Sequence, residues 1–287
     1  MKLALGTVQF GMPYGIANQE GKVGPDEIAR ILAFARETGI SILDTAIAYG
    51  DSEASLGAAG VADLCVITKL PSVPEGESVV PWIRAQVQAS LHRLGVRTVY
   101  GLLLHRPEQL AGVHGAAITD ALAALKAEGL VQKVGVSIYD PAELDTSWPI
   151  LTIDIVQAPF NLIDRRLVNS GWLRRLHEAG VEVHVRSLFM QGLLLLPRAD
   201  IPAKFEAWTP LWDAWHAWLR STDMSAVEAC IAFGQFFPQI DKLVVGVDNV
   251  RQLEQLAAAT CHCRMATWPA IESTDERLIN PSQWSSL

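Results

Sequence analysis

The amino-acid sequence predicts an α/β protein built as a (β/α)8 TIM barrel, and three observations support this fold class. Short runs rich in Val, Ile and Leu alternate with longer segments whose apolar residues recur at helical spacing, which is the pattern of βαβ units. Eight such units fit into 287 residues, close to the barrel's typical length of about 250 residues. The motifs G-x-G-x-x-G and G-x-x-x-x-G-K-[ST] are absent, which disfavours the competing doubly wound sheet.

The strand predictions rest on short apolar runs, rich in β-branched residues, that lie between turn and helix signals. Parallel strands buried on both faces are expected to be nearly continuous in apolar residues, as these runs are. In chain order the expected strands are Leu3–Thr7, Ser41–Leu43, Leu64–Thr68, Val99–Leu104, Lys133–Ser137, Ile153–Gln157, Val181–Val185 and Lys242–Val247.

Helices are expected between these strands, because the intervening segments carry helical periodicity with start and stop signals. The first of them begins with Pro25 and is followed directly by Gly39, which suits the two ends of a helix. In chain order the expected helices are Pro25–Thr38, Ser52–Gly60, Ser78–Arg93, Ala116–Glu128, Pro141–Leu144, Ile163–Ala179, Ser225–Phe236 and Val250–Ala259.

A tryptophan-rich helical insertion is expected at about residues 203–222, between the seventh and eighth strands. Trp208, Trp212, Trp215 and Leu219 fall at i, i+4, i+7 and i+11, which places them on one face of a helix. Packing of this face on the barrel rim is favoured over a substrate lining or a dimer contact. No low-complexity linker or internal repeat interrupts the chain, so residues 1–287 are expected to form a single domain.

Charge and hydropathy restrict the classes of partner. The 31 Asp and Glu residues outnumber 23 Lys and Arg, which gives a formal net charge of -8 and offers no support for binding nucleic acid or anionic membranes. The N-terminus lacks a basic region followed by a long apolar stretch, and no apolar run reaches about 18 residues. We therefore expect a cytoplasmic protein without a membrane anchor, and its oligomeric state stays open.

The four cysteines do not resemble a disulfide framework. Cys65 and Cys230 lie inside apolar runs, which indicates a reducing compartment. The cluster Cys261-His262-Cys263 lacks the spaced second pair of ligands that a structural zinc site needs. We expect no metal.

Four titratable side chains follow successive expected strands. Asp44 and Tyr49 come after the second strand, Lys69 ends the third, and His105 ends the fourth. Catalytic groups of such barrels gather at the carboxyl ends of the strands, so these four are the candidate catalytic residues.

Their chemistry suits the reduction of a carbonyl by hydride transfer, which leaves negative charge on oxygen and requires an acid. A tyrosine with an ordinary pKa of about 10 is a poor acid at neutral pH. We expect the Lys69 ammonium to lower the pKa of Tyr49, and Asp44 to hold that lysine charged. His105, as a neutral donor, would position the carbonyl oxygen.

The motif Asp-Thr-Ala-x-x-Tyr-Gly at residues 44–50, the Ser-Glu pair after it, Lys69 and His105 together resemble the catalytic set of the aldo-keto reductase superfamily. The resemblance extends from Leu5-Gly6-Thr7 to about Gln255. It implies a barrel that binds a nicotinamide cofactor without a Rossmann fold. The cofactor-binding residues that it implies are Ser137, Gln157, Arg186, Ser187, Gly246, Asp248, Arg251 and Gln255.

Two positions expected near the nicotinamide depart from the family pattern. Ile138 stands where relatives often have Asn, so Ser137 and Gln157 are expected to anchor the nicotinamide. Arg186 stands where many relatives have an aromatic residue that stacks on the nicotinamide, and a guanidinium can also stack on a ring.

The cofactor's second phosphate is expected near the start of the last helix, where two residues oppose each other. Arg251 could hold a 2′-phosphate, whereas Asp248 could accept the ribose hydroxyls of NAD. The charge-assisted pair favours Arg251 narrowly. NADP is therefore the expected cofactor, with NAD as the alternative.

The leading functional prediction is an NAD(P)H-dependent oxidoreductase that interconverts a carbonyl (aldehyde, ketone or sugar) and an alcohol, with tyrosine as the general acid and base. One alternative is a sugar epimerase or lyase that uses a retained nicotinamide cofactor. Another is a low-turnover, NADP-binding regulatory subunit, which the intact quartet disfavours. The substrate itself stays open, and its candidate contacts are Phe10, Tyr14, Phe160, Asn161 and the insertion from Trp208 to Trp218.

Overall fold

Eight parallel strands close into a barrel in the computed structural model, which describes residues 1–18, 20–261 and 267–287. Each strand pairs with the next one along the chain, and β8 pairs with β1 to complete the ring. This confirms the predicted (β/α)8 TIM barrel. The strands are β1 (Leu3–Gly6), β2 (Ile42–Asp44), β3 (Cys65–Leu70), β4 (Val99–Leu104), β5 (Val131–Ser137), β6 (Ile155–Pro159), β7 (Glu182–Arg186) and β8 (Lys242–Gly246).

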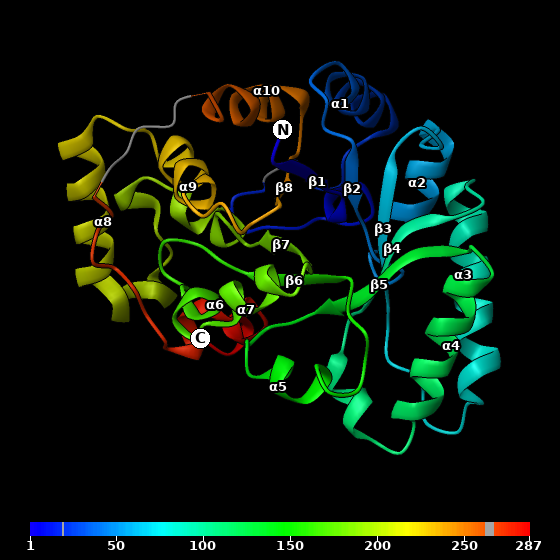
Figure 1. Ribbon diagram of the computed structural model, residues 1–287. Helices are drawn as coiled ribbons and strands as arrows, with labels where there is room; N and C mark the ends of the chain where they lie inside the picture. The colour runs from blue at the N-terminus through cyan, green and yellow to red at the C-terminus, as the bar shows by residue number, and fades with distance from the viewer. Residues whose placement is uncertain (19, 262–266) are drawn as a thin grey trace.

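The helices surround the strands, with α3 and α4 on one side of the molecule and α8 on the opposite side (Figure 1). Within the described ranges no helix has the length and apolar character needed to cross a bilayer. The α-helices are α1 (Pro25–Glu37), α2 (Ser52–Ala59), α3 (Val79–Leu94), α4 (Gly115–Ala127), α5 (Glu143–Ser147), α6 (Arg166–Asn169), α7 (Trp172–Glu178), α8 (Thr209–Thr222), α9 (Ala226–Gln235), α10 (Val250–Ala259) and α11 (Glu276–Ile279). Short 3-10 helices are η1 (Val8–Phe10), η2 (Pro107–Ala111), η3 (Met190–Leu195), η4 (Arg198–Asp200), η5 (Ala203–Trp208) and η6 (Pro281–Ser286).

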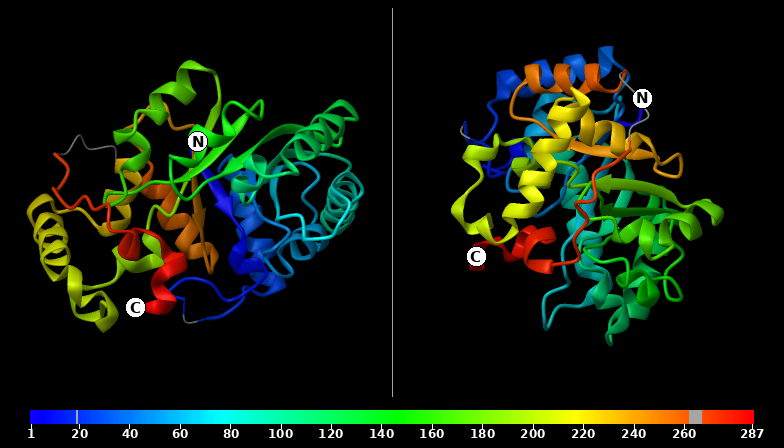
Figure 2. Two further views of the ribbon diagram at one scale, coloured as in Figure 1. Left: turned by 90° about the horizontal axis from the view of Figure 1, so that it is seen from below. Right: turned by 90° about the vertical axis from the view of Figure 1, so that its left-hand side faces the viewer.

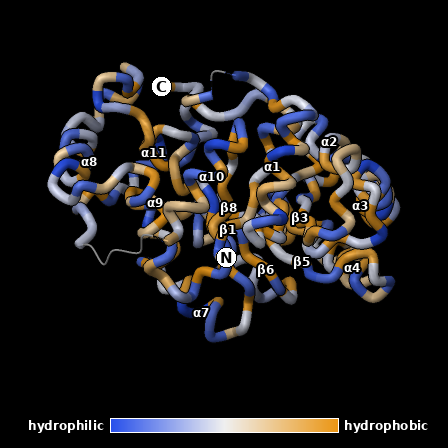
Figure 3. The backbone as a smooth tube through the Cα atoms, turned by 90° about the horizontal axis from the view of Figure 1, so that it is seen from above, coloured by the Kyte–Doolittle hydropathy of each residue, from blue (hydrophilic) through white to orange (hydrophobic). Residues whose placement is uncertain are grey.

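Successive side chains of each strand point to opposite faces of the sheet, which creates two apolar layers. One set of strand side chains packs outward against the helices, and the other set points into the barrel. Figure 3 shows these apolar residues gathered along the strands at the centre of the molecule. The inner cluster consists of Ala4, Ile42, Ile67, Leu103, Ile155 and Val244.

Two of the differences from the expected elements lie near the end of β6. The single helix expected over Ile163–Ala179 is split into α6 and α7, because Gly171 between them adopts a left-handed backbone with φ of 81°. The sixth strand continues to Pro159, so that Gln157 lies in the middle of β6 and not at its end.

The tryptophan-rich insertion forms η5 and α8. Its residues Trp212 and Trp215 are buried, and their indole nitrogens donate hydrogen bonds to the carbonyl oxygens of Phe205 and Leu194, 2.9 and 3.1 Å away. The C-terminal segment lies beside α8 in both views of Figure 2. Its residue Trp284 packs edge-on against Phe205 of η5. The buried face of α8 therefore packs on its own chain.

Candidate active site

A cavity of about 670 Å³ opens at the carboxyl end of the barrel. Its wall is built from the ends of β1, β2, β4, β7 and β8, from the loops that follow them and from Tyr139 after β5. The cavity size lies in the usual range of small-molecule and cofactor sites. The polar side chains that line it are Thr7, Gln9, Tyr14, Asn18, Asp44, Tyr49, His105, Tyr139, Arg186, Ser187, Gln191, Asp248, Gln252 and Gln255.

A buried ion pair lies at the base of this cavity. The Lys69 Nζ donates to both oxygens of Asp44, at 2.8 and 2.7 Å, and to the carbonyl oxygen of Thr45 at 2.9 Å. These three contacts use all three ammonium protons of a side chain that is fully buried. Burial lowers the pKa of Lys69, and the adjacent Asp44 carboxylate opposes that shift.

Tyr49 lies above this pair. The Lys69 Nζ is 5.0 Å from the centre of the Tyr49 ring, and no proton of the ammonium is left for the phenol oxygen. Burial, and then the Asp44 charge, raise the pKa of Tyr49, while Arg186 acts in the opposite direction. The net pKa shift of Tyr49 is therefore upward, opposite to the expected direction, and burial is its largest cause.

His105 packs edge-on against Tyr49, with the ring centres 5.8 Å apart. Burial, with the Lys69 and Arg186 charges, lowers the pKa of His105 to about 4. The imidazole is therefore neutral at physiological pH, and it can donate a hydrogen bond without carrying a charge.

Ser137 and Gln157, the expected nicotinamide anchors, do not line the cavity. The Gln157 Nε2 donates to Asp44 Oδ1 at 2.7 Å, and the Ser137 hydroxyl donates to Gln157 Oε1 at 3.4 Å. Both side chains are buried within the barrel. In this structure their polar atoms hold Asp44, so their direct contact with a cofactor stays a prediction.

Arg186 and Ser187 do line the cavity, at the end of β7. The Arg186 guanidinium donates to the carbonyl oxygen of Ile138 at 3.0 Å and lies 4.6 Å from the centre of the Tyr139 ring. The stacking capacity expected of this arginine is used here on Tyr139. Ser187 adopts a left-handed backbone with φ of 63°, an uncommon conformation for a residue other than glycine.

The segment after β8 divides into residues inside and outside the cavity wall. Gly246, Asp248 and Gln255 line the cavity, and their contact with a cofactor stays a prediction. Arg251 lies on the exposed surface of α10 and does not line the cavity. The wall therefore contains the carboxylate of this segment and excludes its guanidinium.

Of the four candidate substrate residues, Tyr14 lines the cavity and the other three do not. Phe10 is fully buried in the hydrophobic core. Phe160 stacks on Phe233 with ring centres 5.1 Å apart, and Asn161 donates to the Ser187 carbonyl oxygen at 3.1 Å. In this structure the side chains of these three residues serve packing and loop geometry, so their contact with a substrate stays a prediction.

Several cavity residues were not anticipated from the sequence. Gln9 and Asn18 follow β1, Tyr139 follows β5, and Gln191 and Gln252 lie in the loops after β7 and β8. Position after an expected strand end was an available signal for Gln9 and Tyr139. Asn18 and Gln191 lie 12 and 5 residues beyond their strands, and only the folding of the loops brings them to the cavity.

The expected absence of a metal concerns a cluster that is only partly described. Cys261 is exposed, and His262 and Cys263 lie outside the described residues. Among residues 1–18, 20–261 and 267–287, no group of three or more His, Cys, Asp or Glu side chains is arranged to hold a metal ion.

The fold and the cavity define a (β/α)8 barrel protein with an Asp, Tyr, Lys and His group at the carboxyl end of its strands. Residues 2–273 match the Aldo/keto reductase family. The chain belongs to this family.

Similar proteins carry the same family name. The chain is 30% identical over 156 residues to an aldo-keto reductase of Mycobacterium marinum, a match that covers 52% of this chain and 53% of that protein. The chain thus spans about half the length of the curated relatives that it matches.

Solved structures share the fold over most of both chains. An aldo-keto reductase from Bacillus halodurans in its holo form has a TM-score of 0.72 at 22% identity, over 93% of this chain and 88% of that one. A glycerol dehydrogenase from Gluconobacter oxydans has a TM-score of 0.69 at 21% identity, with the same coverage.

Proposed function

We propose that this protein is an NAD(P)H-dependent oxidoreductase that interconverts a small aldehyde, ketone or sugar and the corresponding alcohol. The observation that carries the proposal is that Tyr49, His105 and Asp44 all line one cavity of cofactor size, with Asp44 in an ion pair with Lys69. Family membership agrees with it, because aldo-keto reductases generally use NAD(P)H, and NADP is typical.

The cavity wall fits a dinucleotide. Gly6 and Gly246 leave the ends of β1 and β8 without side chains, and a Cβ at Gly246 would lie only 2.5 Å from the Gln9 amide. Arg186 and Ser187 provide hydrogen-bond donors on one side of the cavity. On the other side the Asp248 carboxylate provides acceptors, and the side-chain amides of Gln252 and Gln255 provide both donors and acceptors. When bound, the nicotinamide supplies or accepts the hydride.

Tyr49 is the proposed proton donor to the carbonyl oxygen. Its hydroxyl is protonated at neutral pH, as a general acid requires, but burial raises the pKa of Tyr49 and makes the proton harder to release. The buried Lys69 ammonium, 5.0 Å from the ring centre, favours the negative charge that develops on the phenol oxygen as the proton leaves. Asp44 positions that ammonium.

His105 is the proposed hydrogen-bond donor that orients the carbonyl oxygen. With a pKa of about 4 it stays neutral, so it can contact the oxygen without giving up a proton. Its edge-on packing against Tyr49 places the two donors on the same part of the cavity wall.

The test is the variant Tyr49→Phe, followed by nicotinamide absorbance with a panel of aldehydes, ketones and sugars and with both NADPH and NADH. We expect at least about a hundredfold loss of kcat with cofactor affinity retained, because the variant removes the proton donor and little volume. Tyr100→Phe, at the opposite end of the barrel, is the matched control. Turnover by Tyr49→Phe at the wild-type rate would contradict the assignment.

A further inference from the structure

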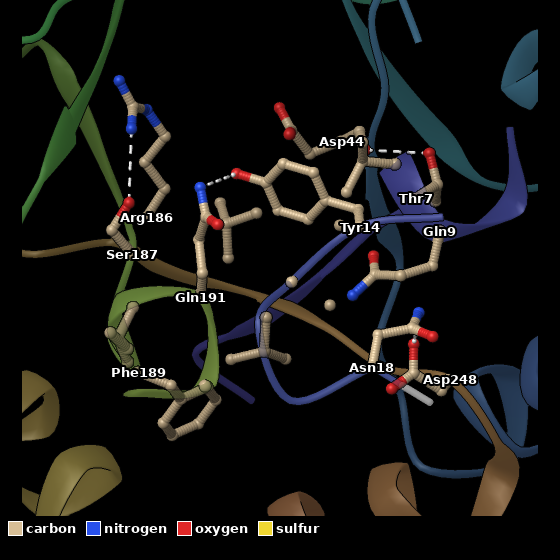
Figure 4. A pocket seen from close by; sticks show the side chains of 18 of the residues that line it. Thr7, Gln9, Tyr14, Asn18, Asp44, Arg186, Ser187, Phe189, Gln191 and Asp248 are labelled. Carbon is tan, nitrogen blue, oxygen red and sulfur yellow. Dashed lines mark hydrogen bonds between the residues drawn. The ribbon is translucent and has the colours of Figure 1, made fainter. Parts of the chain in front are cut away.

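The cavity has two sides of different charge. Figure 4 shows Gln9, Asn18 and Asp248 together on one side, and Arg186 with Ser187 on the other. The first side joins the end of β1 to the end of β8. We call Gln9, Asn18 and Asp248 the β1–β8 wall.

Gln9 carries an unused hydrogen-bonding group in this wall. Its side chain is 9% exposed, and its Oε1 has no hydrogen-bond partner among the described residues. A buried carboxamide oxygen without a partner is costly, so a ligand that donates a hydrogen bond at this point would remove that cost. A hydroxyl group is such a ligand.

Asp248 is held with its carboxylate at the cavity. Asn18 Nδ2 donates to Oδ1 at 2.9 Å, and Gln252 Nε2 donates to Oδ2 at 3.4 Å. The Asp248 backbone N–H donates to Gln252 Oε1 at 2.8 Å, which fixes the residue from a second direction. A carboxylate oxygen can accept two hydrogen bonds, and each oxygen of Asp248 accepts one from these side chains. Both oxygens can therefore accept another from a hydroxyl group.

No cation balances Asp248 in the described part of the wall. Among the described residues that line the cavity, Arg186 is the only arginine or lysine, and it lies on the opposite side. Its guanidinium already contacts the carbonyl oxygen of Ile138 and the ring of Tyr139. Arg251 is exposed on α10 and outside the lining. A phosphate placed against this wall would meet a carboxylate, and like charges repel.

We propose that the β1–β8 wall is a subsite for an unphosphorylated ribose, so that this protein binds NAD(H) in preference to NADP(H). The inference rests on the proposed function, and on the resemblance, which places the cofactor's second phosphate near Asp248 and Arg251. Asp248 and Gln9 accept hydrogen bonds from the ribose hydroxyls, as an acidic residue does in other NAD sites. A 2′-phosphate removes one hydroxyl donor and adds a charge of about -2.

The test is direct binding, measured as quenching of tryptophan fluorescence by NADH and by NADPH. We expect the wild-type protein to bind NADH at least about tenfold more tightly, a difference of about 1.4 kcal/mol. Asp248→Asn keeps the size of the side chain and removes its charge, and it should reduce the NADH to NADPH affinity ratio about tenfold. Glu254→Gln makes the same charge change at an exposed residue of α10 outside the lining, and is the matched control.

The variant Gln9→Leu distinguishes the contribution of Gln9 to binding from that of Asp248. The Gln9 amide is neutral, so its loss should weaken both cofactors with a smaller change in their ratio than Asp248→Asn causes. Tighter binding of NADPH by the wild type would overturn the inference and leave the proposed function intact. The same holds if Asp248→Asn changes the ratio no more than Glu254→Gln does. Failure of correctly folded protein to bind either nucleotide would overturn both.

Discussion

The Lys69 ammonium is fully buried, and all its protons are donated to Asp44 and to the backbone of Thr45. Gln157 adds a hydrogen bond to the same carboxylate. A charge in this position is stable only with its partner, because an unpaired ion in the interior carries a desolvation penalty of several kcal/mol. Asp44 and Lys69, two of the candidate catalytic residues, therefore also contribute to the stability of the barrel.

Lys69→Met should therefore lower the free energy of unfolding by about 3 to 5 kcal/mol, because it leaves the Asp44 carboxylate buried without a cation. Urea denaturation followed by tryptophan fluorescence measures this loss. The double variant with Asp44→Asn should recover most of it, since neither charge remains. Lys22→Met, which breaks an exposed pair with Asp51, should change stability little. A Lys69→Met variant as stable as the wild type would refute the coupling.

At the scale of elements, the loops after β1 and β7 join across the mouth of the cavity. The Ile16 N–H donates to the Gln191 carbonyl oxygen at 3.0 Å, and the Gln191 side chain donates to the Tyr14 hydroxyl at 3.2 Å. Asn18 continues the same loop to Asp248 after β8. The first loop is therefore fastened at both of its sides, and we expect this closure to slow the release of a bound cofactor.

A substitution at Gly192 can test this closure. It has φ of +95°, and a Cβ there would lie 2.7 Å from the Cβ of Ala17. Gly192→Ala should separate the loops and speed cofactor release, on the order of tenfold, as measured by stopped-flow fluorescence. Adding Ala17→Gly removes the clashing methyl group and should partly restore the slow release. Gly180→Ala imposes a similar left-handed strain, φ of +72°, where nothing lies within 4 Å, and should not change the release rate.

At the scale of the whole molecule, a second polar cluster lies at the opposite end of the barrel. Glu182 accepts hydrogen bonds from Lys133, Tyr100 and His184, and although burial opposes the shift, these bonds lower the pKa of Glu182 to about 2. His105, at the carboxyl end, is shifted from 6.5 to about 4. Both shifts make the folded protein bind fewer protons than the unfolded chain, in different pH ranges.

Stability should therefore decrease as the pH falls. Between about pH 6.5 and 5 the unfolded chain protonates His105 and the folded protein does not, so the free energy of unfolding falls with decreasing pH. Glu182 adds its own loss only below about pH 4.5. In urea titrations, His105→Gln should flatten the slope between pH 5 and 6.5 by up to about 1.4 kcal/mol per pH unit. His92→Gln, on the exposed surface of α3, is the control; an unaltered slope in His105→Gln would contradict the assignment.

Local patterns were sufficient to predict the barrel, because strand and helix periodicity and the order of the units depend on neighbours in the chain. The same holds for Asp44, Lys69 and His105, whose places at or beside strand ends follow from that order. Arg251 and Phe160 could not be placed in this way. Whether a side chain near a strand end enters the cavity depends on how loops and helices pack around it.

The sequence by itself determined the (β/α)8 architecture and the group of polar residues at one end of it, since both follow from spacing along the chain. Only the tertiary structure decided the charge of the cavity wall, because Arg251 on α10 lies outside the lining and Asp248, in the loop before α10, lies inside it. It also decided the ionisation of the site. Burial, which sets the direction of the Tyr49 and His105 pKa shifts, is a property of the packed molecule and not of any local segment.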